Sequence, residues 1–381
     1  MAAIPSTLPN KDTLPDLLLA LTALSGEFPI SQVSRLPGSV SYKESAVKKL
    51  KKDRLLRSYY RDGLRGLRLT ASAKRLLLGD QPDRYLPFLS GETSTNAPKY
   101  TISHRLRLHR MAEVFVTMMN TGILVLPWER ENIFHHAPLS LELYIEQPTY
   151  FTSREVKEIG AQAAKIRNSR STGVLLTDGS IFITYNTAAA EMKWDYKAEM
   201  RLKALLQIEL CQRLLPEQYR NAEPSAIVFG ANMTQMEVLM GIGSRIAHNY
   251  FVLDGNFEHF YYLTNDYQGE VILKLLCEAE LKELLDQILM QNLSASRPGW
   301  PVVHDAFDET ESPVLFGYTC DMPRIKRFDT ALSLHDQTGT LICFDFQEET
   351  LRRICGSQVT LQSIDFEAFE RSVLHIPQAT D

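Results

Sequence analysis

A run of positive side chains between residues 42 and 56 has the clearest chemistry in this sequence. It reads YKESAVKKLKKDRLL and contains six Lys or Arg against two acidic residues. Ammonium and guanidinium groups pair with phosphate oxygens. Residues 1–110 contain 19 Lys or Arg against 9 Asp or Glu, whereas the rest of the chain contains 22 against 37. This asymmetry favours a polyanionic partner for the first part of the chain, with uneven surface decoration as the alternative.

Cysteine and histidine offer little chemistry. The five cysteines lie far apart, without a C-x-x-C pair and without a histidine at ligand spacing. This pattern argues against a zinc site and a disulfide framework, and it favours a reducing cytoplasm. The sequence also lacks a P-loop, a G-x-G-x-x-G motif and a histidine triad. We therefore expect no cofactor, no metal site and no catalytic residue.

The basic run is predicted to lie on the third of three short helices. Leucines at spacings of three and four predict a helix over residues 11–25, ended by Gly26. A second short helix is predicted at ISQVSRL, before the turn residues PGS. Ser41 stands three residues before Glu44, which is the spacing of a capping box and predicts the start of the third helix.

The third helix and the hairpin after it carry the candidate DNA contacts. Two short strands are predicted at RLLRSYY and LRGLRLT, and Thr70 is predicted to cap a following helix. Side chains near the N-terminus of a helix in the major groove approach base edges, whereas cations further along meet phosphates. The candidate DNA-binding residues are Ser41, Tyr42, Lys43, Lys48, Lys49, Lys52, Arg54, Arg61 and Arg65.

The order of three helices and a basic hairpin over residues 11–78 resembles a winged helix-turn-helix domain. The stretch LRGLRLTASAKRLL in particular resembles the wing strand and following helix of many bacterial domains of this kind. Binding of duplex DNA by such a surface would neutralise about six phosphates and give a log–log salt slope near −5. Winged helices also act as protein-interaction modules, so an adaptor function stays open.

Residues 79–138 are predicted to be a linker followed by a connecting helix. Residues 79–100 are rich in Gly, Pro, Ser and Thr, which is typical of a linker. The helix in TISHRLRLHRMAEVFVTMMNTGI begins with Arg105, Arg107 and Arg110, which could extend a DNA-binding surface. We expect instead that this helix packs between domains or against a second copy of the chain. Its two histidines are expected at the surface or as caps.

Residues 139–295 are predicted to form a mixed α/β domain, and residues 296–381 a strand-rich lobe. Short β-branched or aromatic runs predict strands at LELYIE, GVLLT, IFITY, AIVFG, YFVLD and FYYLT. Helical periodicity lies between them, in SREVKEIGAQAAKIR, in EMKWDYKAEMRLKALLQIELCQRLL and in TQMEVLMGIGSRIA. A mixed sheet with flanking helices follows from this alternation. The overall fold class is therefore α/β or α+β.

The segment RSTGVLLTDGSIFITYNTAAAEMKWDYKAEMRLKALL resembles the strand–turn–strand–helix run of a restriction-endonuclease-like core. Over residues 15–265 the chain also resembles the replication-relaxation family of bacterial plasmids and integrative elements. Nuclease cores of this type place an acid after one strand and Glu-x-Lys on the next. Asp178 could be the first acid, but the next strand offers only Thr184, Tyr185 and Asn186. We therefore expect a catalytically silent domain.

The resemblance implies a DNA-binding protein of a mobile element, acting in replication, transfer or their transcriptional control. Double-stranded DNA, a second copy of the chain and replication or transfer proteins are the expected partners. The N-terminal residues lack the pattern of a signal peptide, and no apolar run reaches the ~20 residues that span a bilayer. We expect a cytoplasmic protein without a membrane partner. A metal-dependent nuclease with an atypical site is the enzymatic alternative.

Overall fold

The structure is a computed structural model. It describes residues 7–89, 100–134, 143–158, 168–241, 250–253, 255–297 and 299–374. The chain forms two compact units, the first made of residues 1–135 and 149–151, and the second of residues 136–148 and 152–381. Each unit is described by itself.

The first unit contains helices around one small sheet. In chain order its elements are α1 (Leu14–Ser25), β1 (Phe28–Pro29), the 3₁₀-helix η1 (Ile30–Arg35), α2 (Val40–Lys52), β2 (Leu56–Arg61), β3 (Leu64–Leu69), α3 (Ala71–Asp80), α4 (Pro82–Leu89) and α5 (Ile102–Asn120). Gly26 ends α1 in the left-handed conformation with φ of 78°. Leu18, Leu21, Phe28 and Leu67 have no exposed surface and form the centre of its core. Over residues 11–78 the predicted order of three helical segments, two strands and a further helix is confirmed, and the short strand β1 is an addition.

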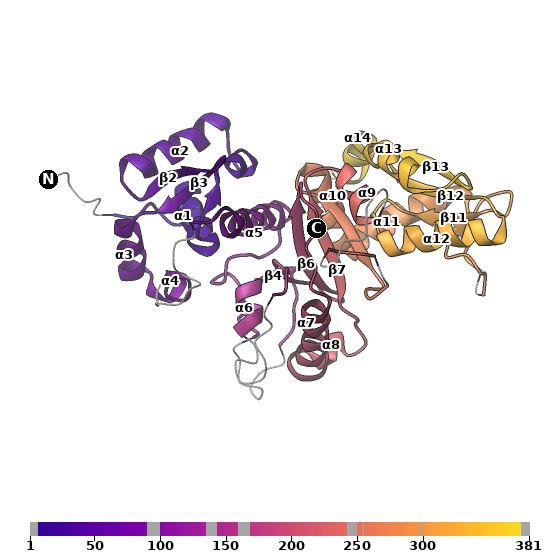
Figure 1. The fold of residues 1–381 in the computed structure, drawn as a ribbon, viewed down its shortest axis with the longest axis horizontal. Coiled ribbons are helices and arrows are strands. Elements are labelled where there is room, and N and C mark those ends of the chain that lie inside the picture. Colours follow the sequence, from indigo (N-terminus) through magenta and orange to yellow (C-terminus); the bar gives the residue numbers. More distant parts are fainter. Residues whose placement is uncertain are drawn as a thin grey trace, which may run out of the picture. The chain divides into compact units, whose positions relative to one another are not determined.

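The β2–β3 hairpin is the main part of the first sheet. Its two-residue turn is Asp62-Gly63, and both residues have positive φ, 53° and 78°. A turn of this kind matches the twist of the two strands that it joins. β1 pairs with β3, so the strand order is β1-β3-β2, and all pairs are antiparallel. Figure 1 shows α2 beside the hairpin, which α2 contacts through β2.

The segment predicted as a linker contains the helix α4. The abundance of Gly, Pro, Ser and Thr over residues 79–100 was the basis of that prediction, which is wrong for Pro82–Leu89. Pro82 is the first residue of the helix, where its missing N–H costs nothing. Tyr85 and Phe88 are buried and hold the helix against the unit. Residues 90–99 lie outside the described residues.

The second unit contains one complete five-stranded sheet and most of another, whose edge strand includes residues 149–151 of the first unit. Its elements up to the second sheet are α6 (Ser153–Glu158), β5 (Gly173–Leu176), β6 (Ile181–Ala188), α7 (Tyr196–Ile208), the π-helix η2 (Glu209–Leu214), α8 (Pro216–Tyr219), β7 (Ser225–Gly230), α9 (Thr234–Leu239) and β8 (Phe260–Thr264). The first sheet has the strand order β4-β5-β6-β7-β8, where β4 is Thr149–Thr152. β5 and β6 are antiparallel, whereas β6, β7 and β8 are parallel. Helices connect the parallel strands, as such crossovers require.

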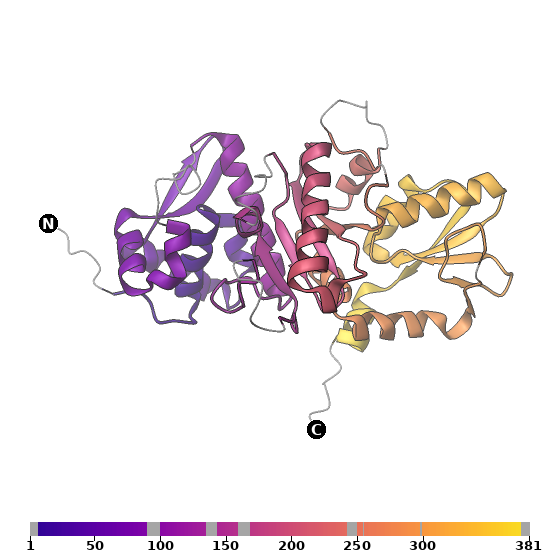
Figure 2. The same ribbon diagram turned by 90° about the horizontal axis from the view of Figure 1, so that it is seen from below.

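The second sheet of this unit has the order β13-β12-β11-β10-β9. The remaining elements are α10 (Tyr267–Cys277), α11 (Ala279–Leu289), η3 (Met290–Asn292), β9 (Ser294–Ala295), β10 (Ala306–Phe307), β11 (Pro313–Phe316), α12 (Met322–His335), β12 (Gly339–Phe344), α13 (Asp345–Ile354), β13 (Val359–Ile364), α14 (Phe366–Phe369) and η4 (Glu370–Leu374). β9, β10 and β11 are antiparallel, and β11, β12 and β13 are parallel. The helices that flank these strands are visible in Figure 2.

The predicted α/β class with mixed sheets is confirmed, but two predicted strands are wrong. Residues 143–146 of LELYIE contain no strand, because the side-chain amide of Gln218 hydrogen-bonds both backbone groups of Ile145. Among the described residues 250–253 of YFVLD, Tyr250 alone forms a bridge, an isolated one to Lys193. The half-buried Phe251 packs on Trp194 with ring centroids 5.1 Å apart, so its ring makes an aromatic contact although its backbone is not in a strand. The predicted helix at SREVKEIGAQAAKIR is described only as far as Glu158.

Candidate nucleic-acid interface

The N-cap of α2 lies two residues earlier than predicted. The side chain of Ser39, not Ser41, accepts a hydrogen bond from the N–H of Tyr42, at 3.3 Å. Gly38, with φ of 103°, turns the chain into the extended conformation that an N-cap residue adopts. Ala46, Val47 and Leu50 form the buried stripe that their spacing predicts. The side of α2 opposite this buried stripe is its outward face.

The outward face of α2 carries most of the predicted DNA contacts. Ser41, Ser45, Lys48 and Lys52 recur at spacings of three and four, which places them on one stripe of the helix. All four are exposed, and so are the neighbouring Tyr42 and Lys49. Val40 in the first turn is 71% exposed. The sequence prediction therefore selected an accessible surface at these positions.

Lys43 has a different location from the one predicted. It is buried, and its Nζ donates hydrogen bonds to the carbonyls of Ser34 and Leu36, at 2.7 and 2.8 Å. These carbonyls lie at the end of η1, where backbone acceptors need partners. Lys43 therefore fastens α2 to η1, and its ammonium is not available to a nucleic acid in this structure.

The β2–β3 hairpin separates its arginines onto two faces. Tyr60 pairs with Arg65 and Arg61 pairs with Leu64, and neighbouring residues of a strand point to opposite faces. Arg65 and the 70% exposed Tyr60 therefore share the face of the core residue Leu67, and Arg61 points the other way.

Arg65 lies on the same side of the hairpin as the last turn of α2. Burial lowers the pKa of the Lys51 ammonium, and the charge of Arg65 nearby lowers it further. Lys48, Lys49 and Lys52 of α2, together with Arg65, are called the exposed basic face. Arg54 is exposed between α2 and β2, with φ of 56°. Arg61 and Arg57, which was not predicted, are exposed on the opposite face of the hairpin.

A buried ionic cluster lies beneath the hairpin and was not predicted from the sequence. The Glu27 carboxylate has no exposed surface and accepts hydrogen bonds from Arg68 Nη2 at 2.7 Å, Arg105 Nη2 at 2.6 Å and His109 Nε2 at 2.9 Å. Burial by itself raises the pKa of the Glu27 carboxyl, but the hydrogen bonds from His109, Arg105 and Arg68 lower it to about 2. These four residues are called the Glu27 cluster, and the carboxylate is its only anion.

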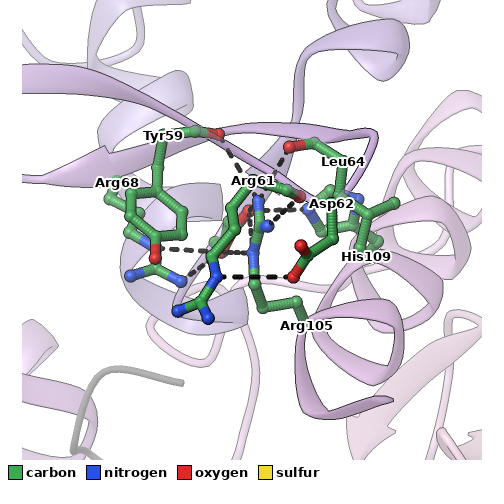
Figure 3. Close-up of polar contacts among 8 residues, drawn as sticks. Tyr59, Arg61, Asp62, Leu64, Arg68, Arg105 and His109 are labelled. Carbon is green, nitrogen blue, oxygen red and sulfur yellow. Dashed lines mark hydrogen bonds and ion pairs between the residues drawn. The ribbon is translucent and has the colours of Figure 1, made fainter. Parts of the chain in front are cut away.

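Arg105 also holds the backbone of the hairpin. Its guanidinium donates hydrogen bonds to the carbonyls of Arg61 at 2.8 Å, Leu64 at 3.1 Å and Tyr59 at 3.4 Å. Figure 3 shows this guanidinium under the hairpin, between the ring of Tyr59 and the residues of the turn. The guanidinium carbons of Arg68 and Arg105 lie 3.8 and 4.6 Å from the Tyr59 ring centroid.

The Glu27 cluster corrects the predictions for the helix now seen as α5. Arg105 is completely buried and cannot extend a DNA-binding surface. His109 is buried against Glu27 rather than exposed or a cap, whereas His104 is exposed and contacts Thr101. Arg107 is exposed. α5 packs against α1, β1 and β3 within the first unit.

The candidate nuclease residues form no metal site. Asp178 accepts hydrogen bonds from the Tyr144 hydroxyl and from Gln218. Glu199 is buried on α7 and accepts from the Tyr185 hydroxyl at 3.0 Å. Within the described parts of the chain, no group of three or more His, Cys, Asp or Glu could hold a metal ion. Across the same residues, no helix combines the length and apolarity that crossing a bilayer requires. His135 and His136 lie outside the described residues.

Comparison with protein-family models, with curated proteins and with solved structures yields no match to this chain. The likeness to the replication-relaxation family therefore stays a prediction from the sequence.

Proposed function

We propose that the first unit binds duplex DNA through α2 and the β2–β3 hairpin, as a winged helix-turn-helix domain does. The observation that carries this proposal is the exposed basic face, where three lysines of α2 and Arg65 of the hairpin are accessible on adjoining elements. α2 would enter the major groove, with Ser41 and Tyr42 near base edges and the lysines near phosphates. The excess of positive charge in residues 1–110 supports the same partner.

The wider role belongs to the same proposal. We infer a mobile-element protein that acts in replication, transfer or transcriptional control, with the second unit serving assembly with replication or transfer proteins or a second copy. This part rests on the sequence resemblance. The absence of a metal cluster from the described residues gives the nuclease alternative no support.

Charge reversal on α2 tests DNA binding directly. We expect the triple variant K48E/K49E/K52E to weaken binding of a random 20-base-pair duplex more than about 100-fold near 0.1 M salt, with a salt slope smaller by about three. Fluorescence anisotropy across a salt series measures both quantities.

The matched control is K193E/K197E/R201E, which makes the same change of charge at exposed positions in the second unit. Its affinity should stay within a few-fold of the unmodified chain. An unmodified chain that does not bind duplex DNA, or whose affinity is the same at low and moderate salt, refutes the proposal. Equal losses in the two triple variants refute the assignment to α2.

A further inference from the structure

The geometry points to Arg105 as a positioning residue for DNA binding: it sets the hairpin in the conformation that meets the duplex, without touching DNA itself. This inference rests on the proposed function. Arg105 is completely buried, so any effect of its replacement on affinity must act through the elements that it holds.

The hydrogen bonds of Arg105 converge on the turn of the hairpin. Arg61 and Leu64 flank the turn Asp62-Gly63, and Arg105 binds the carbonyl of each. One guanidinium therefore joins the end of β2 to the beginning of β3 from beneath. Because the hairpin side chains Tyr60 and Arg65 lie next to these carbonyls in sequence, their directions depend on the same contact.

Arg105 is also anchored to the body of the unit. Its Nε and Nη2 donate to Glu27, which follows α1 after Gly26, and the same Nη2 also reaches the carbonyl of Leu64. The guanidinium thus joins the hairpin to the core carboxylate. A hairpin of two strands is marginal on its own, so its tip depends on such support.

An arginine is needed for this arrangement. The guanidinium presents five N–H donors in a rigid plane, which serve a carboxylate and several carbonyls together. A lysine at position 105 would keep the charge opposite Glu27 but could not bind the carboxylate and the carbonyls of Arg61 and Leu64 in the same way. Charge and positioning can therefore be separated by experiment.

The test uses the full chain and the variants R105Q, R105K and R107Q, the last removing an exposed charge from the same helix. Backbone hydrogen exchange of residues 59–66 in the free protein reports on the hairpin. We expect R105Q to accelerate this exchange about tenfold or more, and R105K to give a smaller acceleration. R107Q should leave the exchange of these residues unchanged.

DNA binding supplies the second measurement. We expect R105Q to weaken duplex binding about tenfold and to reduce the salt slope by about one, since Arg65 would no longer be held against a phosphate. Combined with R65Q, the R105Q change should have little further effect on affinity, because both act through the same contact.

Three results would overturn the positioning role: unchanged exchange at residues 59–66 in R105Q and R105K, an unaltered salt slope in R105Q, or losses of affinity that add fully with R65Q. If R105Q does not fold, R105K decides by the same measurements. Failure of the unmodified chain to bind duplex DNA refutes the proposed function as well. Normal binding with an unaltered slope in the variants refutes only the role of Arg105.

Discussion

The positive side chains of the first unit fall into two regions with opposite surroundings. Those of the exposed basic face lie in water, which solvates them at little cost. Lys43, Arg68 and Arg105 are buried, and each has protein acceptors: two carbonyls for Lys43, and Glu27 for both arginines. The position of an acceptor, rather than the density of charge along the sequence, separates residues that can meet a partner from residues that hold the fold.

This difference predicts two separable effects. Removal of a buried charge or of its acceptor should reduce stability, since the remaining group is left without compensation in a place that water does not reach. Removal of an exposed charge should leave stability nearly unchanged and should reduce binding of a polyanion. The following experiments compare the buried and the exposed charges by their effects on stability and on DNA binding.

Replacement of Glu27 should give the largest effect. In E27Q the guanidinium groups of Arg68 and Arg105 lose their shared anion in the core, and we expect a loss of about 3–5 kcal/mol of stability. Urea unfolding followed by hydrogen exchange of peptides from the first unit measures it. E44Q removes an exposed acid from α2 and should change stability by less than about 0.5 kcal/mol. Equal effects in the two variants would remove the distinction between the regions.

Acid should reduce the stability of the first unit by slightly less than the E27Q substitution does. The pKa of the Glu27 carboxyl is about 2 in the folded state against an ordinary value of 4.5, so its contribution is complete above pH 4.5 and is lost as the pH falls towards 2. We expect a loss of about 3 kcal/mol across this window. Urea midpoints of first-unit peptides at pH 5.5 and pH 3 measure the part of this loss that falls above pH 3, about 2 kcal/mol. Because other carboxyls titrate too, the informative quantity is the difference from E27Q, which should be less sensitive to acid.

A methyl group at position 66 should disturb the Glu27 cluster from the strand side. A Cβ at Gly66 would lie 2.4 Å from Glu27 Oε1, and the hydrogen bonds from Arg68, Arg105 and His109 prevent that carboxylate from moving away. We expect G66A to cost about 1–3 kcal/mol. In G79A the new Cβ meets no atom within 4 Å, so it serves as the control and should be neutral or slightly stabilising. Thermal unfolding of both variants tests the prediction, which fails if G66A is as stable as G79A.

Lys43 offers the most sensitive comparison, because it lies on the same helix as the exposed lysines. K43M should lose about 1–2 kcal/mol of stability through the two unsatisfied carbonyls, whereas K48M should be close to neutral. Duplex binding should show the opposite pattern. K48M should have a salt slope smaller by about one, and K43M should keep the slope of the unmodified chain. If K43M kept full stability and showed the smaller slope, Lys43 would be a DNA contact and the division between the regions would be wrong.

Local signals in the sequence predicted most of the first unit. Leucine spacing, Gly26 and the Thr70 cap each act over a few residues, and the structure has a helix, a helix end or a cap at each place. The buried position of Lys43 could have been predicted by the same means. It lies three, four and seven residues before Ala46, Val47 and Leu50, which is the spacing of the inward stripe.

The Glu27 cluster could not be predicted in this way. Glu27 lies 41 residues before Arg68, 78 before Arg105 and 82 before His109, and a single sequence contains no signal over such separations. In the second unit the aromatic run YFVLD was wrongly predicted as a strand, because an aromatic side chain such as that of Phe251 can pack on another ring without its backbone lying in a sheet.

The separation between Glu27 and its partners bears on where a self-sufficient fragment must end. Residues 11–78 contain every element of the predicted DNA-binding domain, yet they leave out Arg105 and His109. A fragment cut after α3 would place a buried acid against Arg68 alone and leave the turn carbonyls of the hairpin without their donor. A self-sufficient fragment therefore has to include α5, which ends at Asn120.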